Sequence, residues 1–137
     1  MGAGPEVKFQ ILFTPHGRVV VASRGTDHHW LELRLRKRYR GRGHADSLIK
    51  AGLCHIKGKH HLHFSPHLTC AVRAARAYRW TRVGKSHVFE HLEYYTKSSL
   101  RRDIAPFRCR LVQRKRCPNF EGYRKNTIRA VLSLMFG

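Results

Sequence analysis

Alternation of apolar and polar side chains is the feature that most constrains how this chain can fold. Between residues 6 and 13, the side chains of Val7, Phe9, Ile11 and Phe13 are separated by single residues. In a β-strand successive side chains point to opposite faces, so these four share one face. The first ordered segment is therefore predicted to be a strand with one apolar face.

Two further strands are predicted to follow. Residues 18–22 are short and β-branched, and Pro15 and Gly17 in the preceding segment suit a tight connection between the first two strands. Residues 30–36 alternate again, after a predicted turn at 23–29. Together these segments predict an antiparallel meander. In its third strand, Leu31, Leu33 and Leu35 are expected on one face and Glu32, Arg34 and Arg36 on the other.

Helices are predicted for much of the remaining chain. Ser65 followed by Pro66 is a typical helix start, since proline lacks an N–H that the first helical position leaves unpaired anyway. A helix is expected from there to Gly84, and another over residues 87–97, capped by Ser86.

The end of the chain is predicted to hold one strand and one helix. Residues 107–113 alternate as a strand with one basic face, and Pro106 ends any helix before it. Residues 127–136 have apolar side chains at helical spacing and are expected to dock on this domain or on a neighbour. The predicted fold class is α+β: a single domain over 1–137, with a small N-terminal antiparallel β-meander, two or three helices, a basic strand, a C-terminal amphipathic helix and a flexible basic loop at about 36–46.

Charge indicates the partner. The chain has 28 Lys and Arg against 8 Asp and Glu, giving a formal net charge of +20. Such a chain repels itself, and binding a polyphosphate relieves that repulsion while releasing condensed counterions. Arginine outnumbers lysine roughly two to one, and its planar fork pairs with phosphate and stacks on bases, which favours structured RNA.

Basic residues gather in several segments, some with aromatic or glycine residues between them. The densest is residues 34–44, where Tyr39 offers a ring for base stacking and Gly41 and Gly43 allow close backbone approach. The predicted RNA-binding residues are Arg34, Arg36, Lys37, Arg38, Tyr39, Arg40, Arg42, Lys57, Lys59, Arg73, Arg76, Arg79, Arg108, Arg110, Arg114, Lys115, Arg116, Arg124 and Lys125.

Residues 54–70 hold two cysteines and five histidines and raise the question of a metal site. Four zinc ligands can be named in this segment, Cys54, His63, His67 and Cys70, but their spacing departs from the short-spaced pairs of structural zinc sites. The preferred interpretation assigns no metal and no cofactor. The histidines are then neutral or partly charged donors facing phosphate beside Lys57 and Lys59, and the cysteines are small buried residues with reduced thiols.

No coherent catalytic set is found, and the chain is not expected to be an enzyme. The segment TRVGKS ends like a phosphate-binding loop, but Arg79 stands where that loop needs its first glycine. Asp27 with His28 and His29 resembles a metal phosphoesterase motif, yet the carboxylates that a two-metal site needs are scattered. A zinc-stabilised histidine nuclease or a DNA-binding protein remains the alternative.

In composition the chain resembles ribosomal proteins as a class: small, arginine-rich and basic on several elements. The resemblance is diffuse and carries over no functional residue. It implies a structural subunit of a ribonucleoprotein particle, a ribosome, that stabilises rRNA by neutralising phosphate; mitochondrial and cytoplasmic ribosomes both stay open, with an organellar one slightly preferred. Expected partners are RNA and, through the C-terminal helix, a neighbouring protein; no membrane and no small-molecule substrate are expected, since no segment approaches the ~20 apolar residues of a span.

Overall fold

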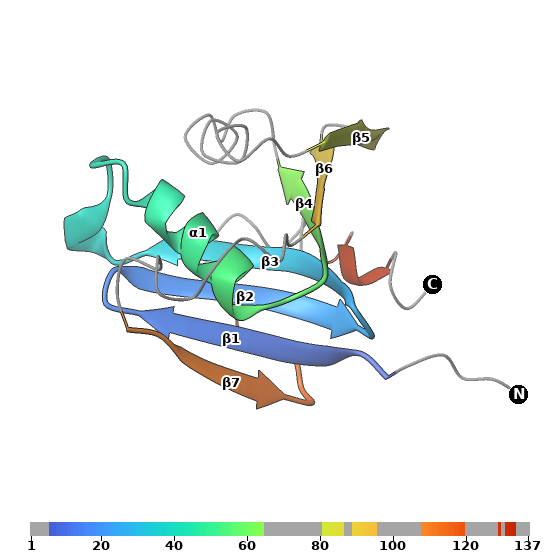
Figure 1. Ribbon diagram of the computed structural model, residues 1–137, viewed down its shortest axis with the longest axis horizontal. Coiled ribbons are helices and arrows are strands. Elements are labelled where there is room, and N and C mark those ends of the chain that lie inside the picture. Colours follow the sequence, from blue (N-terminus) through green and yellow to red (C-terminus); the bar gives the residue numbers. More distant parts are fainter. Residues whose placement is uncertain are drawn as a thin grey trace, which may run out of the picture.

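A computed structural model describes residues 6–64, 81–86, 89–95, 108–119, 129 and 131–133. Its strands form one mixed sheet in the order β5-β6-β4-β3-β2-β1-β7 (Figure 1). The fold is α+β. The elements in chain order are β1 (Lys8–Thr14), β2 (Gly17–Arg24), β3 (Asp27–Leu35), the 3₁₀ helix η1 (Lys37–Tyr39), α1 (Ala45–His55), β4 (Lys59–Phe64), β5 (Thr81–Ser86), β6 (Phe89–Tyr95) and β7 (Arg110–Arg114).

The antiparallel meander is confirmed. Strand β1 pairs with β2, and β2 pairs with β3, both antiparallel. Strand β3 begins at Asp27 rather than at Trp30, because a tight turn at Gly25 and Thr26 takes up only part of the connection. Gly25 has a φ of 60°, in the left-handed region that glycine adopts without strain.

A β-bulge makes one predicted face assignment wrong. The pairing register between β2 and β3 shifts between Val20 and Val21, so Leu31 is the extra residue opposite that step. Leu31 consequently packs with the cluster that contains Val20, whereas Leu33 and Leu35 pack against the cluster on the other face.

Helix α1 and strand β4 occupy a region for which no such elements were predicted. Strand β4 runs parallel to β3, and α1 is the crossover between them. Figure 1 shows α1 lying across one face of the meander. The predicted flexible loop at 36–46 is accordingly shorter, since η1 begins at Lys37 and α1 at Ala45.

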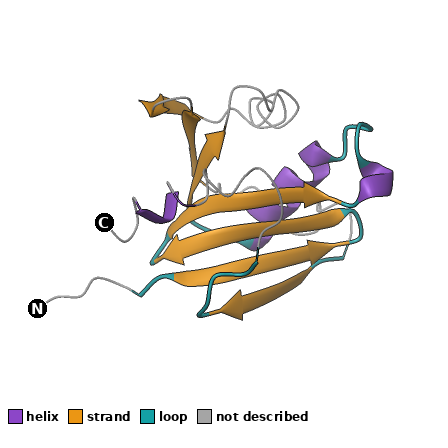
Figure 2. Cartoon of the chain, turned by 180° about the vertical axis from the view of Figure 1, so that it is seen from behind, coloured by secondary structure: helices purple, strands orange, loops and turns teal. Residues whose placement is uncertain are grey.

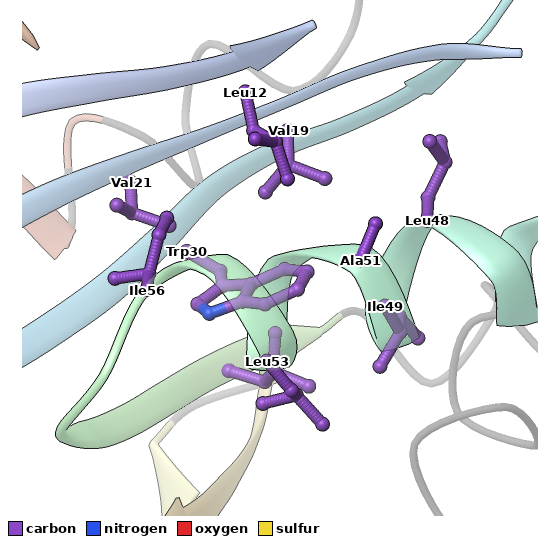
Figure 3. Packing of buried hydrophobic residues seen from close by; sticks show 10 residues of the cluster. Leu12, Val19, Val21, Trp30, Leu48, Ile49, Ala51, Leu53 and Ile56 are labelled. Atoms are coloured by element: carbon purple, nitrogen blue, oxygen red, sulfur yellow. The ribbon is translucent and has the colours of Figure 1, made fainter. Parts of the chain in front are cut away.

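The main hydrophobic core lies between α1 and the sheet (Figure 3). The Trp30 ring packs so closely on α1 that a methyl group added at Gly52 would lie 2.6 Å from it. Glycine at this helical position therefore serves the packing of helix on sheet. The fully buried members of this core include Leu12, Val19, Val21, Leu48, Ile49, Leu53 and Leu62.

A second cluster covers the opposite face of the sheet, which Figure 2 shows from behind. Val7, Phe9 and Ile11 are buried there as the alternation predicts, and Phe13 packs against them. Val131, 2% exposed, belongs to this cluster. Residues 129 and 131–133 are helical, while the bounds of the predicted C-terminal helix lie outside the described residues.

Two helix predictions in the middle of the chain are wrong where the structure describes them. Residues 81–86 and 89–95 form the antiparallel strands β5 and β6, and β6 also pairs with β4. The i, i+3 spacing of Phe89 and Leu92 fits a helix, but pairing with β4 decides the conformation. Residues 65–80, which contain the predicted start of the middle helix, lie outside the described residues. Within the described part of the chain, no helix is long and apolar enough to cross a membrane.

Candidate nucleic-acid interface

One end of the sheet carries a row of arginines across four neighbouring strands. The strand registers place Arg110 of β7 opposite Phe13, Phe13 opposite Arg18, and Arg18 opposite Arg34. Residues that are directly opposite one another project from the same face of a sheet. The arginine row, defined as Arg110, Phe13, Arg18 and Arg34, thus presents three cations and one aromatic ring on one face.

This row borders a groove of about 660 Å³, here called the arginine groove. Its walls come from the ends of β1, β2 and β3, the start of β7 and the basic segment after β3. Six cations line it, and the local potential is strongly positive because a concave wall focuses their fields. The lining residues are Phe13, Thr14, Gly17, Arg18, Arg34, Leu35, Arg36, Lys37, Arg40 and Arg110.

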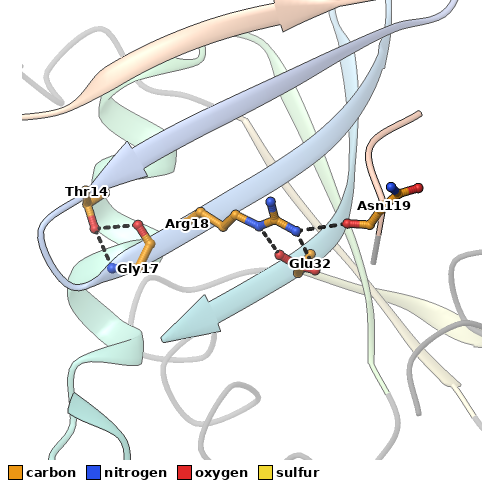
Figure 4. Close-up of polar contacts among 5 residues, drawn as sticks. All are labelled: Thr14, Gly17, Arg18, Glu32 and Asn119. Atoms are coloured by element: carbon orange, nitrogen blue, oxygen red, sulfur yellow. Dashed lines mark hydrogen bonds and ion pairs between the residues drawn. The ribbon is translucent and has the colours of Figure 1, made fainter. Parts of the chain in front are cut away.

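Hydrogen bonds hold the β1–β2 turn and the segment after β3, which together shape the groove. The Thr14 hydroxyl donates to the Gly17 carbonyl over 3.0 Å and accepts from the Gly17 amide over 3.1 Å (Figure 4). The Arg36 amide donates to the His16 carbonyl over 2.8 Å, which ties the segment after β3 to this turn. Arg40 Nε donates to the Leu35 carbonyl over 3.1 Å, which directs its side chain back toward the groove.

Arg18 has a carboxylate partner within the sheet. Its guanidinium forms an ion pair with Glu32, whose side chain is 5% exposed, and Nη2 donates to the Asn119 carbonyl over 3.1 Å (Figure 4). Pairing with Arg18 satisfies a carboxylate that is costly to bury alone. Arg18 therefore has a structural role, linking β2, β3 and the segment after β7.

Arg110 lies against an aromatic ring at the opposite side of the groove. Its Cζ atom is 4.8 Å from the centroid of the Phe13 ring, within the range of a cation–π contact. Arg110 is exposed, and Phe13 is partly buried against the second cluster. The ring thus holds the guanidinium in a defined orientation at the mouth of the groove.

Three rings pack together beside the groove. The His16 ring centroid lies 4.6 Å from that of Tyr39 and 4.3 Å from that of His44, and the Tyr39 and His44 centroids are 5.4 Å apart. Arg38 lies over the Tyr39 ring and donates to its hydroxyl over 2.7 Å. This cluster holds η1 against the β1–β2 turn and fixes the direction of the basic segment.

The structure brings together part of the predicted RNA-binding set. Arg34, Arg36, Lys37 and Arg40 meet Arg110 in the groove, although about seventy residues separate Arg110 from the others. The sequence analysis did not identify Arg18 and Phe13 as site residues. Counting residues outward from the turn of the predicted hairpin would have placed the two opposite each other.

Other predicted residues lie elsewhere. Lys57 and Lys59 are near the start of β4, beside the first residue of β3 and so at the other end of that strand from Arg34. Arg38, Tyr39 and Arg42 belong to the segment after β3 but do not line the groove, and Arg108, Arg114, Lys115 and Arg116 are exposed around β7. Arg73, Arg76, Arg79, Arg124 and Lys125 lie outside the described residues.

Two histidines of residues 54–70, His60 and His61, correct the expectation that the histidines of this segment face phosphate. His60 is fully buried and His61 nearly so. Trp30 Nε1 donates to His60 Nδ1 over 2.8 Å, and His60 Nε2 donates to the Ile56 carbonyl over 2.7 Å. These partners fix a neutral ring, and burial lowers the pKa of His60 to about 3, with repulsion from His28 adding to the effect.

His28 belongs to the same buried network. The Gln10 amide donates to the Ser23 hydroxyl over 2.9 Å, Ser23 lies 2.6 Å from His28 Nδ1, and His28 Nε2 lies 2.8 Å from the Lys57 carbonyl. Burial is the main cause that lowers the pKa of His28. Every described contact of this chain of groups is internal, which is typical of a network that specifies a core.

Within the described part of the chain, no group of three or more histidine, cysteine or acidic side chains could hold a metal ion. Cys54, which lies on α1, is buried as predicted, whereas Cys109 is partly buried and Cys117 is exposed. The side chains of the other three candidate zinc ligands, His63, His67 and Cys70, lie outside the described residues. His63 and His67 are also the histidines of the nuclease alternative.

No protein-family model and no curated protein sequence matches this chain.

Proposed function

We propose that this chain is a structural RNA-binding subunit of a ribonucleoprotein particle, a ribosomal protein of an organellar ribosome. The arginine groove is the observation that carries the proposal. It gathers Arg34, Arg36, Lys37 and Arg40 with the distant Arg110 in one concave surface. Unless an anion lies between them, cations so close together repel one another, and a phosphate backbone supplies such anions at regular spacing.

The proposal assigns the chain a holding role rather than a chemical one. The described histidines His28 and His60 are buried in the core, where they are hydrogen-bonded to Ser23 and Trp30. Bound RNA would screen the net charge of +20 and so stabilise both partners. A neighbouring protein would contact the C-terminal helix at its exposed positions, Arg129 and Ser133, since Val131 packs inside this chain.

The salt dependence of RNA binding tests this proposal. We propose that four cations on one side of the groove, Arg34, Arg36, Lys37 and Arg40, each neutralise one phosphate, and each neutralised phosphate of a single strand contributes about −0.7 to the slope of log K against log salt concentration. We therefore expect a slope of roughly −3 or steeper, measured by fluorescence anisotropy with labelled RNA from 50 to 300 mM KCl. The purified chain should also co-sediment with ribosomal particles and dissociate as salt rises. Failure to bind RNA at low ionic strength would contradict the proposal.

A further inference from the structure

We infer that the arginine groove takes an unpaired, single-stranded segment of RNA, with its phosphates on the side formed by Arg34, Arg36, Lys37 and Arg40 and a base stacked on Arg110. The inference rests on the proposed function and specifies the form of RNA that this site recognises. It follows from the size of the groove, from the division of charge within it and from the contact between Arg110 and Phe13.

Size excludes a double helix. The arginine row crosses three strand spacings, or roughly 14 Å, and the groove encloses about 660 Å³. That volume is in the range of pockets that hold small organic ligands, and it suits one or two nucleotides. A double helix is too wide to enter it, since one groove of B-form DNA alone is about 12 Å wide, so a duplex could contact only the rim.

Charge is divided unevenly between the two sides. Arg18, in the middle of the row, is paired with Glu32, so the carboxylate largely neutralises its positive charge at this point of the groove. The residues of η1 and its flanks, Arg36, Lys37 and Arg40, are exposed, and among the described residues no carboxylate is paired with them. The phosphates are therefore directed to this side of the groove.

The other side of the groove suits a base. A guanidinium group is planar, so a ring that contacts one of its faces leaves the second face to stack on another flat group. Phe13 contacts Arg110 in this way, and Arg110 is exposed. Stacking of an unpaired base on an arginine plane is a recurrent mode of single-strand RNA recognition, and a base inside a duplex does not offer its face.

Strand β7 offers a matched pair of variants for the test. Arg110 and Arg114 are both exposed, they lie at the two ends of the same strand, and both pair with phenylalanines of β1. Replacing either with glutamine removes one charge, but Arg114 does not line the groove. The probes are a ten-nucleotide unstructured RNA and an RNA hairpin with the same number of phosphates.

We expect the wild-type chain to bind the single strand at least about tenfold more tightly than the hairpin. Arg110→Gln should weaken single-strand binding roughly tenfold, through the loss of one stacking surface and one nearby positive charge, and Arg114→Gln by about twofold or less. Arg110→Lys keeps the positive charge but removes the planar guanidinium group. The slope of log K against log salt concentration should therefore stay the same, while affinity falls roughly threefold. Circular dichroism confirms that each variant folds.

Equal losses for Arg110→Gln and Arg114→Gln, or binding of the hairpin as tightly as of the single strand, would overturn the inference while leaving RNA binding intact. Absence of binding to both RNAs would instead overturn the proposed function. Unchanged affinity of Arg110→Lys would show that only charge is used and would also overturn base stacking at this site.

Discussion

Between pH 6.5 and pH 4, the free energy of unfolding is expected to fall by about 3 kcal/mol through His60 alone. Burial lowers its pKa in the folded protein from 6.5 to about 3. In that pH range the unfolded chain therefore binds a proton at His60 that the folded chain does not. The contribution of His60 to the free energy of unfolding is fully present above pH 6.5. It falls by about 1.4 kcal/mol per pH unit below that pH and stops falling near pH 3, where the histidine of the folded protein also binds a proton.

The variant His60→Gln isolates this effect. Glutamine does not titrate, yet its carbonyl oxygen can accept from Trp30 Nε1 and its amide can donate to the Ile56 carbonyl, as the imidazole does. The free energy of unfolding, measured with urea from pH 7 to pH 4, should fall with decreasing pH by about 1 kcal/mol per pH unit less in this variant than in the wild type.

A core variant without any change in histidine content controls for the loss of stability itself. Ile49→Val in α1 removes one buried methyl group and should lower stability by about 1 kcal/mol at every pH. If the free energy of unfolding of His60→Gln depends on pH as steeply as that of the wild type, His60 is not a buried neutral histidine. If the pH dependence of Ile49→Val differs from that of the wild type, the pH dependence follows overall stability rather than the His60 ring.

Removing three cations from one side of the arginine groove is expected to weaken RNA binding roughly 50-fold at about 0.15 M salt. The variant is Arg36→Gln/Lys37→Gln/Arg40→Gln. Counterion release at this salt concentration is worth roughly fourfold in affinity per phosphate of a single strand, and the three factors multiply. All three side chains are exposed, so the fold should tolerate the change.

The matched control removes the same charge from a surface outside the groove. Arg114, Lys115 and Arg116 are consecutive, exposed and basic, and they do not line the groove. Their triple glutamine variant should weaken binding by a few fold, because salt screens cations that are distant from the bound strand. A loss of similar size in both triple variants would mean that net charge rather than the groove governs binding.

The meander could be predicted from sequence because its information is local. Alternation in residues 6–13 and 30–36 sets which side chains face the core, and short connections determine which strands pair. The position of Leu31 could not be predicted in the same way. It depends on a bulge that becomes visible when β2 and β3 are laid side by side.

Helix α1 carried a readable signal that was passed over. Leu48, Ile49, Gly52, Leu53 and Ile56 follow helical spacing, but no helix was predicted before Ser65. Strands β5 and β6 are a different case. Their sequence permits helix or strand, and the choice depends on β4, which itself pairs with a strand about thirty residues earlier.

Most cations of the candidate site were predictable from the sequence, but Arg18, Phe13 and the geometry of the site were not. Basic segments around Arg36 and Arg110 are evident from composition, but the sequence does not say that β7 pairs with β1 and brings them together. The buried histidines show the opposite failure. Because Lys57 and Lys59 precede His60 in the sequence, a histidine exposed on the surface was expected. Strand β4 instead pairs with β3, and His60 is buried beside Trp30.

Photo-crosslinking of a 4-thiouridine-labelled single-stranded RNA to the full chain, followed by mass spectrometry of the linked peptides, tests the central claim most directly. If RNA occupies the arginine groove, crosslinks should concentrate in residues 13–18, in residues 34–40 and at Arg110, and should disappear when unlabelled single strand competes. Crosslinks that avoid all three segments and instead follow the basic residues at 57–59 or 114–116 would contradict it.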